Sequence, residues 1–80
     1  MPTVLRINGL RVVIYPNDHQ PPHVHVKGPN GEAVFNINCP EGPVTLREND
    51  GFSKAQLNDI EEPLNANLRH LCAEWRRIHD

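Results

Sequence analysis

Residues 3–15 contain two short runs rich in apolar, strand-forming side chains, which predicts two strands joined by a tight turn. The pair Asn8-Gly9 lies between two runs rich in β-branched residues, and this is the strongest short-range signal for a hairpin. A two-residue turn there places Ile7 opposite Leu10 and Arg6 opposite Arg11. One face of the hairpin would carry Leu5, Ile7, Leu10, Val12 and Ile14, and the other would carry Val4, Arg6, Arg11, Val13 and Tyr15.

A second hairpin is predicted over residues 23–38, with its turn at residues 28–31, which read Gly-Pro-Asn-Gly. Pairing across this turn sets Lys27 opposite Glu32, His25 opposite Val34 and His23 opposite Asn36. The apolar face then carries Val24, Val26, Ala33, Phe35 and Ile37. The histidines fall on the opposite face, and a slip of one residue would exchange the two faces.

The period of the pattern changes from Ser53 onward, after a loop, a short strand and a turn. Residues 39–43 are predicted as a loop, residues 44–48 as a short edge strand and residues 49–51 as a turn. Ser53 and Gln56 form a capping box that starts a helix. Its apolar stripe comprises Leu57, Ile60, Leu64, Leu68, Leu71, Trp75 and Ile78. Pro63 interrupts the stripe, so we expect a kink, or two helices with Pro63 near the start of the second.

These elements predict one α+β domain over residues 1–80. Two antiparallel β-hairpins would form a sheet of about four to five strands over roughly residues 3–48. A helix or kinked helix pair over residues 53–79 would cover one face. Only 38% of the 80 residues are hydrophobic, so the core is small. Scaffolds of this size often rely on a metal, a disulfide or a partner chain for stability.

The net charge and the cysteine content indicate which partner class and which cellular compartment to expect. The net charge of −2 lacks the basic excess of nucleic-acid-binding domains, so nucleic acid is not favoured as a partner. Cys39 and Cys72 are the only cysteines. They allow one bridge but show no CxxC spacing or secreted disulfide framework, and we interpret Cys72 as a small buried hydrophobe. Without a membrane-length apolar run or a signal-peptide pattern, we expect a soluble cytoplasmic protein.

The concentrated chemistry lies in residues 18–25, which hold three histidines and one aspartate. His23 and His25 are two residues apart on a predicted strand, so they share a face. Asp18 and His19 lie on the proline-rich loop before it. Three imidazole nitrogens and one carboxylate oxygen match a tetrahedral site for zinc or another divalent transition metal. If Asp18 stays outside the ligand set, the fourth position is open for catalysis.

Two other interpretations of these residues stand beside the metal site. His23 or His25 would act as general acid or base in an enzyme, with nearby cations stabilising negative charge. In the structural interpretation, the same side chains only hydrogen-bond neighbouring loop and strand atoms. Arg6 and Arg11 face each other across the first hairpin, so they either point apart into water or share an anionic ligand.

Several motifs resemble the small bacterial family known as domain of unknown function 4160. They are the string Asp-His-x-Pro-Pro-His-x-His at residues 18–25, the pair Glu32-Ala33 and the pair Glu74-Trp75. The resemblance covers nearly the whole chain. It implies genes in bacteria and mobile elements, often beside another small gene as in a toxin–antitoxin cassette, with no established activity. Pro63, with Asn65 and Asn67, departs from the more regular helix of the relatives.

Three functions follow from this pattern. The first is a cytoplasmic binding or regulatory module that acts on a small protein partner, within a two-gene cassette of the toxin–antitoxin kind. The second is a metal-dependent or histidine-based hydrolase or nuclease-like toxin, and the third is a zinc-stapled structural domain. The small size favours the module, because 80 residues leave little room for a separate substrate pocket.

Overall fold

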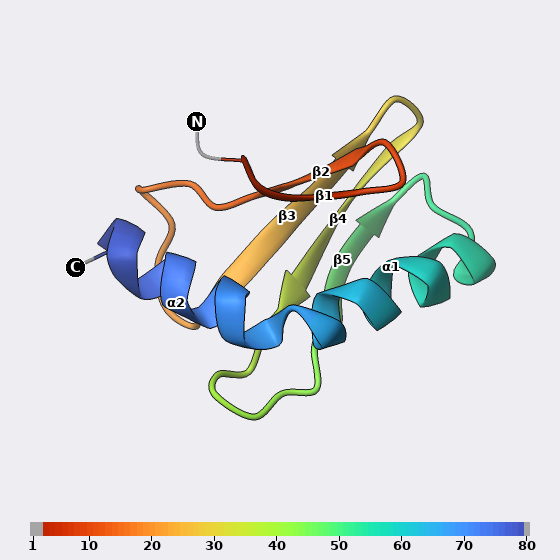
Figure 1. Cartoon of the computed structure of the whole chain (residues 1–80). Helices are drawn as coiled ribbons and strands as arrows, with labels where there is room; N and C mark the ends of the chain where they lie inside the picture. Colours follow the sequence, from red (N-terminus) through yellow and green to blue (C-terminus); the bar gives the residue numbers. More distant parts are fainter. Residues whose placement is uncertain (1–2, 80) are drawn as a thin grey trace.

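The chain folds as one open five-stranded sheet followed by two helices, in a computed structural model that describes residues 3–79 (Figure 1). All neighbouring strands are antiparallel and follow the order of the sequence. The predicted α+β class is therefore confirmed. The elements are β1 (Thr3–Ile7), β2 (Leu10–Val13), β3 (His23–Gly28), β4 (Gly31–Asn36), β5 (Thr45–Asp50), α1 (Lys54–Ala66) and α2 (Leu68–His79).

Both hairpins have the predicted register. Arg6 pairs with Arg11 across β1 and β2, and His25 pairs with Val34 across β3 and β4. Two details of the first hairpin differ from the prediction. β2 ends at Val13 instead of continuing to Tyr15. An irregularity between Thr3 and Leu5 turns Val4 against the core, so its predicted place on the opposite face is wrong.

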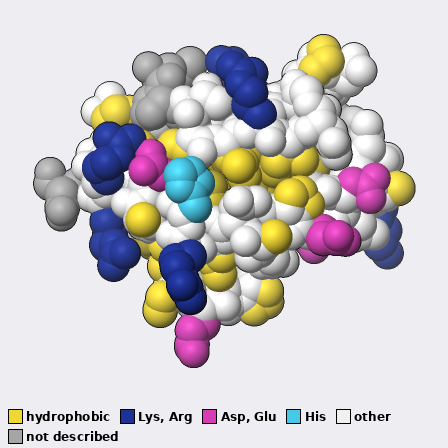
Figure 2. Space-filling model, viewed as in Figure 1, with side chains coloured by type: hydrophobic (Ala, Val, Ile, Leu, Met, Phe, Trp, Pro, Cys, Tyr) yellow, Lys and Arg dark blue, Asp and Glu magenta, His cyan; other side chains and the backbone are white. Residues whose placement is uncertain are grey.

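The core lies between one face of the sheet and the helix pair. The predicted apolar residues of β3 and β4 are almost fully buried, and the helical stripe from Leu57 to Trp75 packs over them. Figure 1 shows α1 and α2 end to end across this face. In the same view, Figure 2 shows apolar side chains between β1 and the helices, where partly buried residues border the core.

β5 is an edge strand, as predicted, but it starts at Thr45 and runs to Asp50. All six of its residues are exposed. Asn49 and Asp50, which we assigned to a turn, therefore belong to the strand, and the chain bends only at Gly51. The Asn49 side chain accepts a hydrogen bond from the Phe52 amide at 3.1 Å and donates one to the Phe52 carbonyl at 2.9 Å. These bonds stabilise the bend that follows the strand.

The helical region divides at Asn67, not at Pro63. Ser53 and Gln56 form the predicted capping box at the start of α1. Pro63 lies inside α1, so the prediction that it starts a second helix is wrong. Its missing N–H affects only the turn before it, whereas its own carbonyl accepts bonds from the backbone and side-chain amides of Asn67, at 3.0 and 2.8 Å. The backbone bond is the regular bond of an α-helix, so α1 continues past Pro63, and it ends where Asn67 leaves the helical conformation with φ −109° and ψ 19°.

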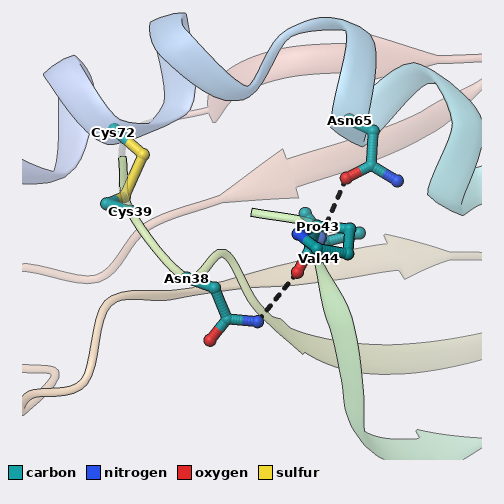
Figure 3. The surroundings of a disulfide bond; sticks show 6 residues. All are labelled: Asn38, Cys39, Pro43, Val44, Asn65 and Cys72. Atoms are coloured by element: carbon teal, nitrogen blue, oxygen red, sulfur yellow. Dashed lines mark hydrogen bonds between the residues drawn. A yellow bond between two sulfur atoms is a disulfide. The ribbon is translucent and has the colours of Figure 1, made fainter. Parts of the chain in front are cut away.

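A disulfide between Cys39 and Cys72 ties the loop between β4 and β5 to α2 (Figure 3). Their Cα atoms lie 5.8 Å apart, within the usual range for this bond. Cys72 is buried, as expected, but it is a bonded half-cystine and not a free thiol. The Val44 amide also donates to the Asn65 side chain of α1 at 2.8 Å, so the loop is held by both helices.

None of the helices within residues 3–79 is both long and apolar enough to cross a membrane. The expected cytoplasmic location stays a prediction.

Candidate metal centre

A tight turn brings Asp18 back against the sheet. After β2 the chain turns at Pro16 and Asn17, and the Asp18 amide donates to the Tyr15 carbonyl at 3.1 Å. Proline is favoured at the second position of such a turn because its φ is already fixed near the required value. The turn leaves Asp18 half-buried beside the first residues of β3.

β3 presents both histidines on the face opposite the helices, as its register requires. His25 lies between Val13 and Val34, its partners on the neighbouring strands, and both valines are buried. His23 is the first residue of β3 and is only 6% exposed. It is the one buried polar residue of the described chain, residues 3–79.

Asp18, His23 and His25 converge on one point. The same carboxylate oxygen, Asp18 Oδ2, lies 3.2 Å from His23 Nε2 and 3.1 Å from His25 Nε2. One ligand atom from each of the three residues lies within 4.8 Å of the others. The sequence placed these residue types in one segment, and the fold brings three of them within reach of a single ion.

The contact of His23 with Pro21 fixes the hydrogen on the His23 ring. The Pro21 carbonyl can only accept, so its 2.8 Å contact assigns a hydrogen to Nδ1. In a neutral ring, Nε2 then carries a lone pair 3.2 Å from a carboxylate oxygen. Two such groups repel each other, unless a second proton or a metal ion lies between them.

His25 has a related environment. Its Nδ1 is buried without a hydrogen bond in the described structure, and Glu32 Oε2 lies 3.6 Å away. In both rings, Nε2 therefore lies near Asp18 and Nδ1 lies near an oxygen acceptor. Metal-binding histidines usually have this arrangement, in which the distal nitrogen donates to a carbonyl or carboxylate and so orients the ring.

Aromatic neighbours pack against both imidazoles. The Tyr15 ring meets the His25 ring edge-on at a centroid distance of 4.8 Å, and the Trp75 ring lies 5.4 Å from the His23 ring. These contacts limit ring rotation, which favours a preformed site. Lys27 Nζ lies 5.1 Å from the centre of the Tyr15 ring. Hydrogen bonding to the Tyr15 side chain raises the pKa of Lys27 above its ordinary value, so the ammonium stays charged.

The other predicted site residues lie elsewhere. His19 is exposed and does not belong to the cluster of Asp18, His23 and His25. Arg6 and Arg11 face each other on β1 and β2, one hairpin away. The expected contact between Lys27 and Glu32 is absent from the ion pairs of residues 3–79, although the two residues are register partners.

Sequence reasoning missed three residues around the histidines. Glu32 is the diagonal cross-strand neighbour of His25, so the predicted register already contained that signal. Tyr15 falls on the histidine face by simple alternation along the first hairpin. Trp75 was correctly predicted as core, but its contact with His23 depends on where α2 crosses the end of β3, which no local pattern reveals.

The fold and this cluster define a small α+β protein with an aspartate–histidine site on one open sheet. A family model described as a domain of unknown function, DUF4160, matches residues 9–76, and the chain belongs to this family. Comparisons with curated proteins and with solved structures find no match.

Proposed function

We propose that this protein is a binding module whose central ligand is a divalent transition metal, held by Asp18, His23 and His25. One observation carries the proposal. Both imidazoles have Nε2 within 3.2 Å of the same carboxylate oxygen, while each Nδ1 lies near an oxygen acceptor. With a cation bound at Asp18, both Nε2 atoms would act as ligands, the His23 Nδ1–H would keep its bond to the Pro21 carbonyl, and Glu32 is the nearest acceptor for His25 Nδ1, at 3.6 Å.

The spacing of the donor atoms supports a metal of the size of zinc. Bonds of about 2.0–2.1 Å at tetrahedral angles separate two ligand atoms by about 3.3 Å. The two contacts of Asp18 Oδ2, at 3.2 and 3.1 Å, are close to this value. Imidazole nitrogen with carboxylate oxygen suits zinc and its neighbours in the first transition row.

The number of ligands favours an open site over a closed structural one. Structural zinc sites are almost always closed by four protein ligands, whereas three ligands leave a position for water or another molecule. His19 would be the fourth ligand of the sequence prediction, but it lies outside the cluster. A zinc staple is therefore the weaker alternative. Action on a small protein partner, in a two-gene cassette, stays a prediction.

Isothermal titration of metal-free protein with zinc, and visible spectroscopy with cobalt, test the proposal. We expect one ion per chain and the intense absorption bands of low-coordinate cobalt. Asp18→Asn and His25→Gln each remove one ligand with little change of shape. Losses of 10–100-fold are typical even for residues that only orient a ligand, so each variant should lose at least about 100-fold in affinity.

His19→Ala is the matched control, because it removes an exposed histidine from the same loop. It should bind zinc as the wild type does. Glu32→Gln should weaken binding by about 10–100-fold, as expected for a residue that orients a ligand. Absence of zinc binding by the wild type would refute the proposal. Binding that survives Asp18→Asn and His25→Gln but is lost in His19→Ala would refute it as well.

A further inference from the structure

A row of three cations crosses the first three strands on the same face as the histidines. Arg6 pairs with Arg11 across β1 and β2, and Arg11 pairs with Lys27 across β2 and β3. The register continues to Glu32 on β4 and Asp50 on β5, so the row changes sign halfway across the sheet. We call Arg6, Arg11 and Lys27 the basic row.

The basic row is electrostatically unfavourable in the protein alone. Like charges directly opposite each other on neighbouring strands destabilise a sheet, and the row contains two such pairs in succession. Within residues 3–79, none of the three cations forms an ion pair. The acidic side chain nearest in register, Glu32, lies instead beside His25. A bound anion would relieve this repulsion.

The basic row also lines a cavity. Arg6, Arg11 and Lys27 surround a space of about 220 Å³ between the two hairpin turns, which lie at the same end of the sheet in Figure 1. Gly9, Gly28 and Pro29 complete the lining, and the space beside the Gly9 Cα is open, so a ligand can approach the backbone there. One water occupies about 30 Å³ of liquid, so a tetrahedral oxyanion fits.

The charge and geometry of the row suit a phosphate better than a carboxylate. Two guanidinium groups and one ammonium offer three positive charges and several N–H donors. A phosphate monoester carries about −1.5 to −2 charges and three acceptor oxygens, and arginine binds it in bidentate fashion. A carboxylate has one charge and two oxygens. The acidic half of the row, on β4 and β5, disfavours a long polyanion.

We infer that Arg6, Arg11 and Lys27 bind the phosphate group of a small phosphate ester. This inference goes beyond the metal site and holds without it. Lys27 is two residues from His25 on the same strand face, a separation of about 7 Å. A ligand held by its phosphate in this cavity would therefore lie on the same sheet face as the histidine cluster.

The test is titration of the full-length, metal-free protein with inorganic phosphate, followed by two-dimensional amide NMR. Sodium chloride at matched ionic strength is the reference. We expect saturable shifts at residues 6–11 and 27–28 with phosphate and none with chloride. Hydrogen bonds to charged groups are strong, so Arg6→Gln/Arg11→Gln should weaken phosphate binding by at least about tenfold. The matched control, Arg69→Gln/Arg76→Gln, makes the same charge change on α2 and should bind phosphate as the wild type does.

Two further measurements keep the inference falsifiable. Phosphate should raise the melting temperature of the wild type but not that of Arg6→Gln/Arg11→Gln. In chloride, this row variant should melt no lower than the wild type. A nucleoside 5′-monophosphate should bind at least as tightly as inorganic phosphate and more tightly than a dinucleotide. Phosphate shifts no larger than those with chloride, or equal losses in the row variant and the α2 control, would overturn the inference. Tighter binding of the dinucleotide would overturn the assignment to a small ester.

Discussion

The disulfide between Cys39 and Cys72 should supply a large share of the stability of this small protein. The two residues are separated by 33 positions in the sequence. In the chain-entropy model, closing a loop of this length in the unfolded state stabilises the folded state by about 3.7 kcal/mol at 25 °C. Small domains have a total stability of about 5–15 kcal/mol, so reduction should remove a substantial fraction of it.

Thermal unfolding of the same preparation, oxidised and then reduced with a phosphine, measures this contribution directly. For a domain of this size, each kcal/mol shifts the melting temperature by about 4–8 °C, so reduction should lower it by roughly 15–30 °C. The variant Cys39→Ser/Cys72→Ala should melt close to the reduced wild type. Alanine is chosen at Cys72 because this site is only 7% exposed and would bury an unpaired serine hydroxyl.

Thiol titration and intact mass decide whether the bond forms at all. The oxidised protein should show no reactive thiol after denaturation and a mass lower by two hydrogens than the reduced protein. Two titratable thiols in the untreated protein would refute the pairing. Equal melting temperatures of the oxidised and reduced forms would refute the entropic reasoning, even if the bond forms.

Two further results are expected. Phe35→Ala removes a fully buried ring from the core, so urea unfolding should show a loss of about 3–5 kcal/mol; a loss below 1 kcal/mol would contradict the assigned register. Ser53→Ala removes the side-chain cap of α1 and should cost about 1 kcal/mol in the same assay, whereas Ser53→Gly should cost only a few tenths.

The two hairpins could be predicted because several local signals require the same register. Asn8-Gly9 and residues 28–31 specify tight turns, and the alternation on each side allows one pairing that buries the apolar residues. The helical region could be predicted equally well, because its apolar stripe and its capping box both indicate a helix that begins after Ser53. Val4 was misplaced because a bulge changes the alternation without leaving a mark in the sequence.

The features that were not predicted depend on contacts between distant segments. The Asn65 side chain accepts a hydrogen bond from the Val44 amide, and Cys72 forms a disulfide with Cys39. Both contacts form only when the loop between β4 and β5 packs against the helices (Figure 3). A kink, or a second helix with Pro63 near its start, was expected because proline is the strongest helix breaker in this region. The break comes four residues later, where Asn67 leaves the helical conformation and its side-chain amide donates to the Pro63 carbonyl.

The number of possible ligands depends on whether Asp18, His19 or both lie beside His23 and His25. Asp18 and His19 are adjacent, so no periodicity distinguishes them, and the sequence prediction included both. The turn after Tyr15 distinguishes them, because its hydrogen bond to the Asp18 amide directs that side chain to the sheet and leaves His19 exposed. Four ligands would have enclosed a structural ion, whereas three leave a position for an outside molecule. That open position and the basic row lie on one face of β3, the strand that joins the two proposed sites.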